Sequence, residues 1–95
     1  MNKIGKVATT VQNDDSKLVV TYHNTDVVTF HKETNTLVLD TGGWFTATTK
    51  TRMNQTANEY NLNYYVYQDK GQWYVNADDH IYKFDGNSVV IFGEC

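Results

Sequence analysis

One stretch without a turn signal, residues 44–60, most limits how this chain can fold. A strand of that length would be unusual, because most strands have roughly three to ten residues. Spacings of four, four and three would place one set of its side chains on a single helical face: Thr49, Met53, Ala57 and Tyr60. We therefore predict a helix over residues 46–59, with Thr46 or Thr48 as its N-cap.

The same stretch also carries a competing strand pattern. Side chains alternate from Phe45 to Met53, and Thr is a poor helix former because its branched side chain loses rotamer freedom. A strand over residues 45–53 would remove both the helix and any effect of a helix dipole. Length favours the helix.

Short strand-like segments fill the sequence on both sides of the predicted helix. Thr, Val and Tyr are abundant and Pro is absent, which favours strands. The predicted order β-β-β-α-β-β-β-β makes one α+β domain over residues 1–95, with an antiparallel sheet of six or seven short strands and one central helix packed on it. The predicted strands are residues 17–23, 26–31, 36–40, 63–68, 73–77, 80–84 and 88–92, with a further short strand at 6–11.

The first two of these strands form a predicted hairpin. Asn24 and Thr25 supply a tight turn, since Asn tolerates a left-handed backbone. One face of the hairpin would then gather five apolar side chains, namely Leu18, Val20, Tyr22, Val28 and Phe30.

Charge and composition exclude several classes of protein. The net charge of −3 argues against a general nucleic-acid binder, which usually has a basic surface. Apolar runs reach about four residues, far below the ~20 that span a bilayer, so we expect neither a membrane segment nor a signal peptide. The lone Cys95 excludes an internal disulfide, and an intracellular protein is expected.

The sequence offers no catalytic or metal-binding constellation. His23, His31 and His80 lie in different predicted strands without metal-ligand spacing, and no thiol or acidic cluster accompanies them. The adjacent pairs at residues 14–15 and 78–79 are better explained as turn formers than as an acid and base. We therefore predict no catalytic residues, no metal, no cofactor and no enzymatic turnover.

The best candidate for function is the segment around the predicted helix start. It contains the only adjacent glycines and the only Arg, and no acidic residue falls within residues 41–58. A Gly-Gly turn into a helix gives free N–H groups and the positive end of a dipole, which together suit an anion. The alternative is a solvated helix face with glycines needed only for the turn. The candidate binding residues are Gly42, Gly43, Trp44, Thr46, Thr48, Lys50, Arg52 and Gln55.

The second block of strands is dense in aromatic side chains. An exposed aromatic face can stack bases or contact a protein, whereas ordinary sheet packing would bury it. The residues are Tyr64, Tyr65, Tyr67, Trp73, Tyr74, Tyr82 and Phe84.

Residues 39–55 read Leu-Asp-Thr-Gly-Gly-Trp-Phe-Thr-Ala-Thr-Thr-Lys-Thr-Arg-Met-Asn-Gln. Together with residues 24–28, 65–68 and 73–75, this stretch resembles a group of small bacteriophage proteins. Their typical motif is Thr/Ser-Gly-Gly-Trp-x-Thr-x-Thr-Thr-Lys-x-Arg-Met-Asn-Gln. Many members carry a basic residue where this chain has Phe45. The resemblance implies a phage origin and transfers no catalytic residues.

With that origin, we expect an accessory protein that acts by stoichiometric binding in the cytoplasm of the infected host. Its partner would be a host or anti-phage-defence protein, which it would inhibit or link to another protein. The alternative is a nucleotide- or nucleic-acid-binding protein that uses the Gly-Gly turn and the helix start. A virion component and a small enzyme are less favoured.

Overall fold

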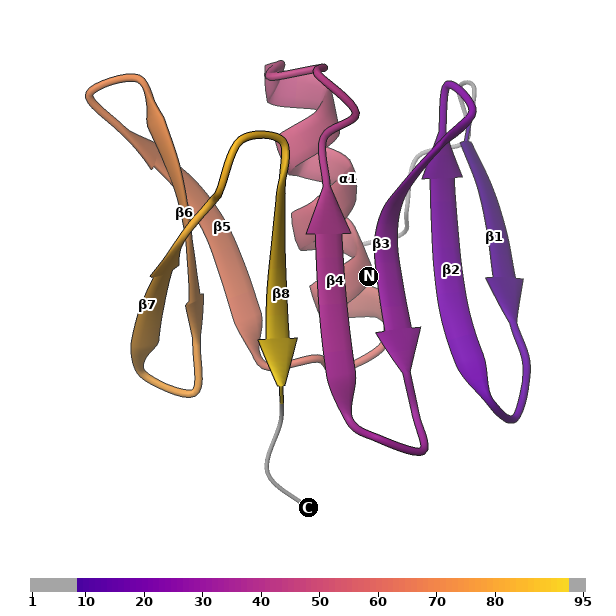
Figure 1. The fold of residues 1–95 in the computed structure, drawn as a ribbon. Coiled ribbons are helices and arrows are strands. Elements are labelled where there is room, and N and C mark those ends of the chain that lie inside the picture. Colours follow the sequence, from indigo (N-terminus) through magenta and orange to yellow (C-terminus); the bar gives the residue numbers. More distant parts are fainter. Residues whose placement is uncertain (1–8, 93–95) are drawn as a thin grey trace.

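The computed structural model describes residues 9–92 and has the predicted α+β class, with four strands, one helix and four more strands in the described part (Figure 1). The bounds are β1 Thr9–Asn13, β2 Lys17–Tyr22, β3 Thr25–His31, β4 Thr36–Asp40, α1 Ala47–Glu59, β5 Tyr64–Asp69, β6 Gln72–Ala77, β7 His80–Lys83 and β8 Ser88–Phe92.

The strands divide into two antiparallel sheets, where a single sheet of six or seven strands was expected. The larger sheet has the order β1-β2-β3-β4-β8, and the smaller one has the order β5-β6-β7. Strand β8 therefore returns across the molecule to pair with β4, where Leu37 lies opposite Ile91 and Leu39 opposite Val89. The last strand completes the sheet that the first four begin.

The β2–β3 hairpin brings together the apolar residues expected to share a face, but its turn is shifted. Leu18 pairs with Phe30 and Val20 with Val28, as expected from their apolar faces. The turn residues are His23 and Asn24, with φ of 50° and 64°, rather than Asn24 and Thr25. A two-residue hairpin turn of this kind needs positive φ at both central positions. The register of the two strands shifts after Val20, and the strands remain paired from there to the turn.

Helix α1 confirms the helical prediction for the central stretch. Thr46 is the N-cap, and its hydroxyl accepts a hydrogen bond from the Thr49 N–H at 3.2 Å. The buried helix residues are Thr49, Met53, Thr56 and Ala57. This is the face expected from the spacing with Thr56 added and without Tyr60, which is the half-buried C-cap. The Thr56 hydroxyl donates to the Arg52 carbonyl at 2.8 Å, so its burial leaves no unpaired donor.

Hydrogen bonds of the Asn54 and Tyr64 side chains help to join the helix to β5. The Asn54 amide donates to the Val66 carbonyl at 2.9 Å and accepts from the Val66 N–H at 2.8 Å. The buried Tyr64 hydroxyl donates to the Met53 carbonyl at 2.6 Å. Because β5 is an edge strand of the smaller sheet, Asn54 satisfies backbone groups that would otherwise need water.

Two predictions extend beyond the described residues. The strand expected at residues 6–11 begins in the undescribed part, and what is described of it forms β1, which runs on to Asn13 because Asn13 pairs with Leu18. Cys95 lies outside the described residues altogether.

Candidate functional site

The Gly42–Gly43 turn is fixed by its own hydrogen bonds. The Gly42 N–H donates to Asp40 Oδ1 at 2.8 Å, and the Gly43 N–H donates to Thr41 Oγ1 at 3.2 Å. The Trp44 N–H donates to the Thr41 carbonyl at 2.9 Å, and Thr41 itself is fully buried. The turn is therefore a rigid link between β4 and the helix.

These bonds determine what the turn can bind. The backbone donors of Gly42, Gly43 and Trp44 already have acceptors within the chain, one of which is the Asp40 carboxylate. An incoming anion would have to displace a carboxylate from Gly42. The arrangement therefore offers little of the open N–H cradle expected from the sequence.

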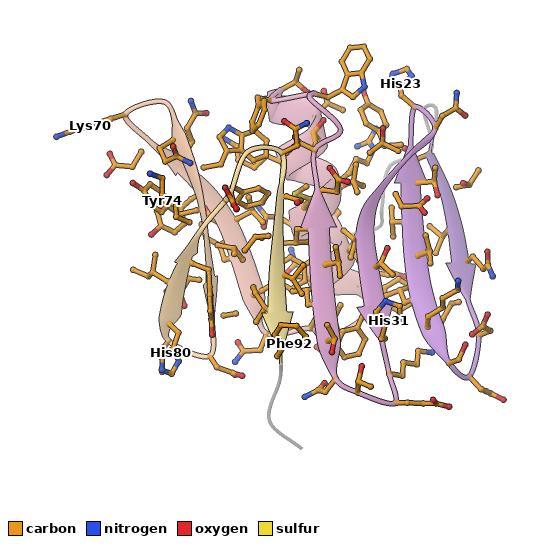
Figure 2. All side chains as sticks on the ribbon, in the orientation of Figure 1. His23, His31, Lys70, Tyr74, His80 and Phe92 are labelled. Carbon is orange, nitrogen blue, oxygen red and sulfur yellow. The ribbon has the colours of Figure 1, made fainter. Side chains whose placement is uncertain are left out.

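Beyond the turn, the chain presents two large rings at the surface. Trp44 is 49% exposed and Phe45 is 47% exposed. The Trp44 ring lies 5.7 Å from that of His23, in the β2–β3 turn, and Phe45 meets the edge of Trp73 in β6 at 5.4 Å. Trp44 and Phe45 are adjacent in sequence but pack against different sheets, and about half of each side chain remains exposed. We call His23, Trp44 and Phe45 the apical patch, and Figure 2 shows His23 at that end of the molecule.

At the start of the helix, one of the Thr hydroxyl groups serves as the N-cap of the helix. The Thr46 hydroxyl is used at the N-cap, while Thr48 is exposed. The first turn contains no acidic residue, so its dipole is not neutralised locally.

Lys50 and Arg52 point to different parts of the molecule. Lys50 Nζ lies 5.5 Å from the Trp73 ring centroid and 3.5 Å from Gln68 Oε1, over the smaller sheet. Arg52 turns toward the larger sheet, where it contacts Thr9 and Tyr22. The structure therefore does not bring the two predicted cations together.

Arg52 is half-buried and well partnered. Its Nε donates to Thr9 Oγ1 at 3.1 Å, its Nη1 donates to Gln55 Oε1 at 3.3 Å, and its Cζ lies 5.7 Å from the Tyr22 ring centroid. These partners are uncharged, so neutral acceptors and a cation–π contact hold the guanidinium group. Gln55 acts here as an acceptor for Arg52.

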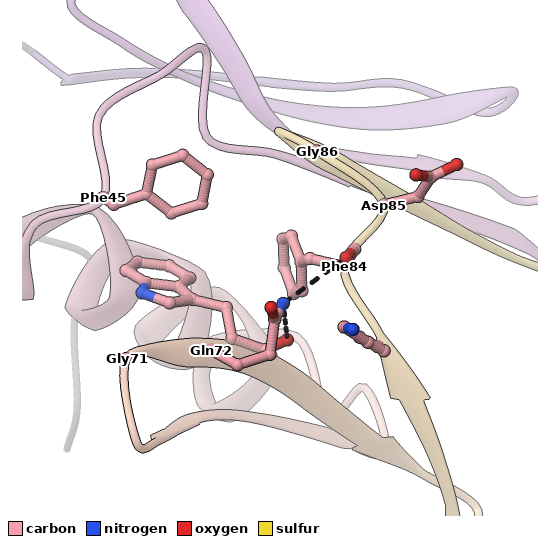
Figure 3. A pocket seen from close by; sticks show the side chains of 8 residues that line it. Phe45, Gly71, Gln72, Phe84, Asp85 and Gly86 are labelled. Carbon is pink, nitrogen blue, oxygen red and sulfur yellow. Dashed lines mark hydrogen bonds between the residues drawn. The ribbon is translucent and has the colours of Figure 1, made fainter.

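A cavity of about 380 Å³ opens beside Phe45 (Figure 3). The Trp73 ring makes T-shaped contacts with both Phe45 and Phe84, the latter at a centroid distance of 5.8 Å, so the three rings form one packed corner. The Gln72 amide closes the side of the corner by donating to the Trp73 carbonyl at 3.2 Å. The lining residues are Phe45, Gly71, Gln72, Trp73, Lys83, Phe84, Asp85 and Gly86.

The aromatic strand residues divide between the two faces of the smaller sheet. Tyr64, Trp73 and Phe84 are buried in the core. On the other face Tyr65 is 60% exposed, and Tyr67 lies between Tyr65 and Tyr74 at centroid distances of 6.2 and 5.6 Å. Both sheet packing and an exposed aromatic face are therefore present.

Within residues 9–92, no group of three or more His, Cys, Asp or Glu is placed to hold a metal ion. The three His are exposed and lie on separate elements. In the same part of the chain, no helix is long and apolar enough to cross a bilayer.

Sequence reasoning missed two residues of the apical patch and one residue that links the helix to β5. Phe45 completes the exposed pair, and an aromatic dipeptide directly after two glycines was the signal available for it. His23 lies beside the Trp44 ring because the β2–β3 turn brings it to the same end of the molecule, and the sequence carries no signal for this contact. Asn54 carries no sequence signal beyond being an amide in a helix centre.

The fold and the site define a small α+β protein with a rigid loop that presents a pair of half-exposed rings. The chain belongs to the Kyanoviridae Gp96 protein family, whose model matches residues 2–90. It is therefore a bacteriophage protein, as the sequence resemblance implied. No curated protein and no solved structure matches the chain.

Proposed function

We propose that this phage protein acts by stoichiometric binding to a host or anti-phage-defence protein in the cytoplasm of the infected cell, as an inhibitor or adaptor and without turnover. The apical patch is the proposed contact. The observation that carries the proposal is the adjacent pair Trp44 and Phe45, each about half exposed on a loop whose backbone is hydrogen-bonded in place.

Two physical properties of the patch favour a protein partner. Trp and other aromatic side chains are over-represented in protein interfaces, where a few of them supply most of the binding energy. A loop already held in one conformation loses little entropy on binding, so more of the contact energy appears as affinity. Lys50, at the side of the same loop, can pair with a carboxylate on the partner's rim.

The geometry gives less support to nucleotide or nucleic-acid binding at the Gly-Gly turn. The turn donors are engaged, Asp40 adds a negative charge beside them, and the chain carries net charge −3. A phosphate would meet repulsion and would compete with existing hydrogen bonds.

Affinity capture from lysates of phage-infected bacteria separates these two functions. Immobilised wild type and Trp44→Ala are compared, with Tyr65→Ala as the control because Tyr65 is equally large and exposed on another face. Retained proteins and small molecules are both identified by mass spectrometry. We expect one or a few proteins to be retained by wild type and by Tyr65→Ala, and to be lost from Trp44→Ala.

Melting temperatures are measured for all three proteins, so that loss of capture cannot be confused with unfolding. Trp44 touches the ring of His23 at the surface, and removing it should leave the fold intact. Retention of a nucleotide or nucleic acid, insensitive to Trp44→Ala, would instead support the alternative function.

A further inference from the structure

A second concave site lies near the C-terminal end of helix α1, where the chain leaves the helix and continues into β5. Its volume is about 280 Å³. Part of its floor is a row of apolar side chains across three paired strands, in which Phe30 lies opposite Leu37 and Leu37 opposite Ile91. Leu62 packs against the same core from the loop that follows the helix.

Amides and a carboxylate surround this apolar floor. Asn35, Asn61, Asn63 and Asp78 line the site, and Asn63 Nδ2 donates to Asp78 Oδ1 at 2.6 Å. This bond holds the Asp78 side chain in one orientation at the edge of the groove. The site therefore joins an apolar floor to a fixed anionic rim.

The surroundings of the groove are also negatively charged. Asp79 adjoins Asp78 in the β6–β7 turn, and Glu59 ends the helix. Glu33 lies in the β3–β4 turn, which also contains Asn35 of the groove lining. The last turn of the helix contains no basic residue, so its carbonyl ends add partial negative charge.

Lys32, in the β3–β4 turn, is directed toward the β1–β2 turn rather than the groove. Lys32 Nζ donates to Asn13 Oδ1 at 2.5 Å and to the Asp14 carbonyl at 2.6 Å, in the neighbouring β1–β2 turn. At the start of β7, His80 Nδ1 lies 2.9 Å from the carbonyl oxygen of Asp78. The negative groups at the rim are therefore not neutralised by Lys32.

We infer that this groove binds a basic, apolar peptide segment of a protein partner. A Leu-like side chain would occupy the floor formed by Phe30, Leu37 and Ile91, and a flanking Arg or Lys would pair with Asp78 and Asp79. The site is independent of the apical patch. With both sites, one chain can hold two protein surfaces at once.

The probe is an acetylated hexapeptide that alternates Arg and Leu, titrated into ¹⁵N-labelled protein and followed by NMR. We expect the largest amide shifts at residues 61–63 and 77–79, and little change at Gly42 and Gly43. One matched peptide carries Glu in place of Arg, and another carries Ser in place of Leu. Both should bind at least about tenfold more weakly, because each lacks half of the recognition.

Two double variants with the same charge change test the position of the anionic rim. Asp78→Asn with Asp79→Asn alters the groove, and Asn tolerates the positive φ of 51° and 64° found there. Asp69→Asn with Asp85→Asn makes the same charge change at the end of β5 and between β7 and β8. We expect the first pair to weaken peptide binding about fivefold to tenfold, and the second pair to change it less than about twofold.

The inference fails if the Arg–Leu peptide does not bind, if the Ser peptide binds equally well, or if both Asp pairs weaken binding equally. Trp44→Ala should leave peptide binding unchanged, so this test is separate from that of the apical patch.

Discussion

Gly42 occupies a position that a side chain cannot enter without displacing a neighbour. Its φ is +61°, and a Cβ atom there would lie 2.5 Å from Thr25 Oγ1. Gly43 has a φ of +88° but nothing within 4 Å of its Cβ position. The two glycines therefore share a backbone requirement, and only Gly42 has a packing requirement as well.

This difference predicts unequal effects of the two Ala substitutions. Gly43→Ala should lower the free energy of unfolding by about 1–2 kcal/mol, the cost of a left-handed backbone at a non-Gly residue. Gly42→Ala should lower it by roughly 3 kcal/mol or more, because the clash with Thr25 adds to that cost. Urea unfolding measures the free energy of unfolding of both variants. Equal losses would show that the close contact with Thr25 adds no cost to a side chain at position 42.

Asp14 predicts a specific acid sensitivity at the β1–β2 turn. The Lys17 and Ser16 backbone N–H groups donate to its carboxylate, both at 2.9 Å, and hold the pKa of Asp14 well below its usual value. Its contribution to stability is therefore complete above the unfolded pKa of about 3.9 and is lost as pH falls toward the folded pKa.

Asp14→Asn keeps an acceptor oxygen but cannot titrate. From about pH 5 to pH 2, wild type should lose more stability than the variant, because only wild type loses the carboxylate. Thermal unfolding by circular dichroism across that range measures the difference. Parallel curves for the two proteins would contradict the role assigned to Asp14.

At the scale of elements, Asn54 connects the helix to the edge of the smaller sheet. Both of its hydrogen bonds go to one residue, Val66, which is fully buried. Asn54→Ala should lower the free energy of unfolding by roughly 2–4 kcal/mol, because it leaves the Val66 N–H and carbonyl without partners.

Asn58→Ala is the matched control for this change. Asn58 is exposed on the same helix, and Ala is the better helix former, so stability should stay the same or rise slightly. Urea unfolding of both variants provides the comparison. Similar losses would mean that helix propensity, rather than the link to β5, determines the effect.

Much of the element order was predictable from the sequence, for a physical reason. The spacing of Thr49, Met53 and Ala57 marks a helical face, and alternating strands separated by Asn, Asp and Gly turns mark the rest. The division into two sheets was not predictable in this way, because the pairing of β4 with β8 joins segments almost fifty residues apart. Local patterns do not encode such contacts.

The candidate site was predictable only in part. The segment and its exposed Trp44 were identified from glycines, composition and charge. The engagement of the Gly42 and Gly43 donors depends on Asp40 and Thr41 side chains, whose directions the sequence does not give. Lys50 and Arg52 are two positions apart on a helix, so they face different neighbours.

For the whole molecule, the two ends of the helix have different surfaces. The helix start lies beside the rings of Trp44 and Phe45 on a fixed loop. The helix end lies beside a groove with Asn and Asp at its rim. The β4–β8 pairing fixes both surfaces on one frame, so the separation between them should persist when either is occupied.

The proposed function predicts a defined complex through the apical patch. Isothermal titration calorimetry of the captured host protein with wild type should give saturable binding at one phage protein per binding site. Trp44→Ala should weaken that binding by about 2 kcal/mol or more, roughly thirtyfold, with its melting temperature nearly unchanged. Wild-type affinity in the folded Trp44→Ala variant would contradict the proposal that this surface makes the contact.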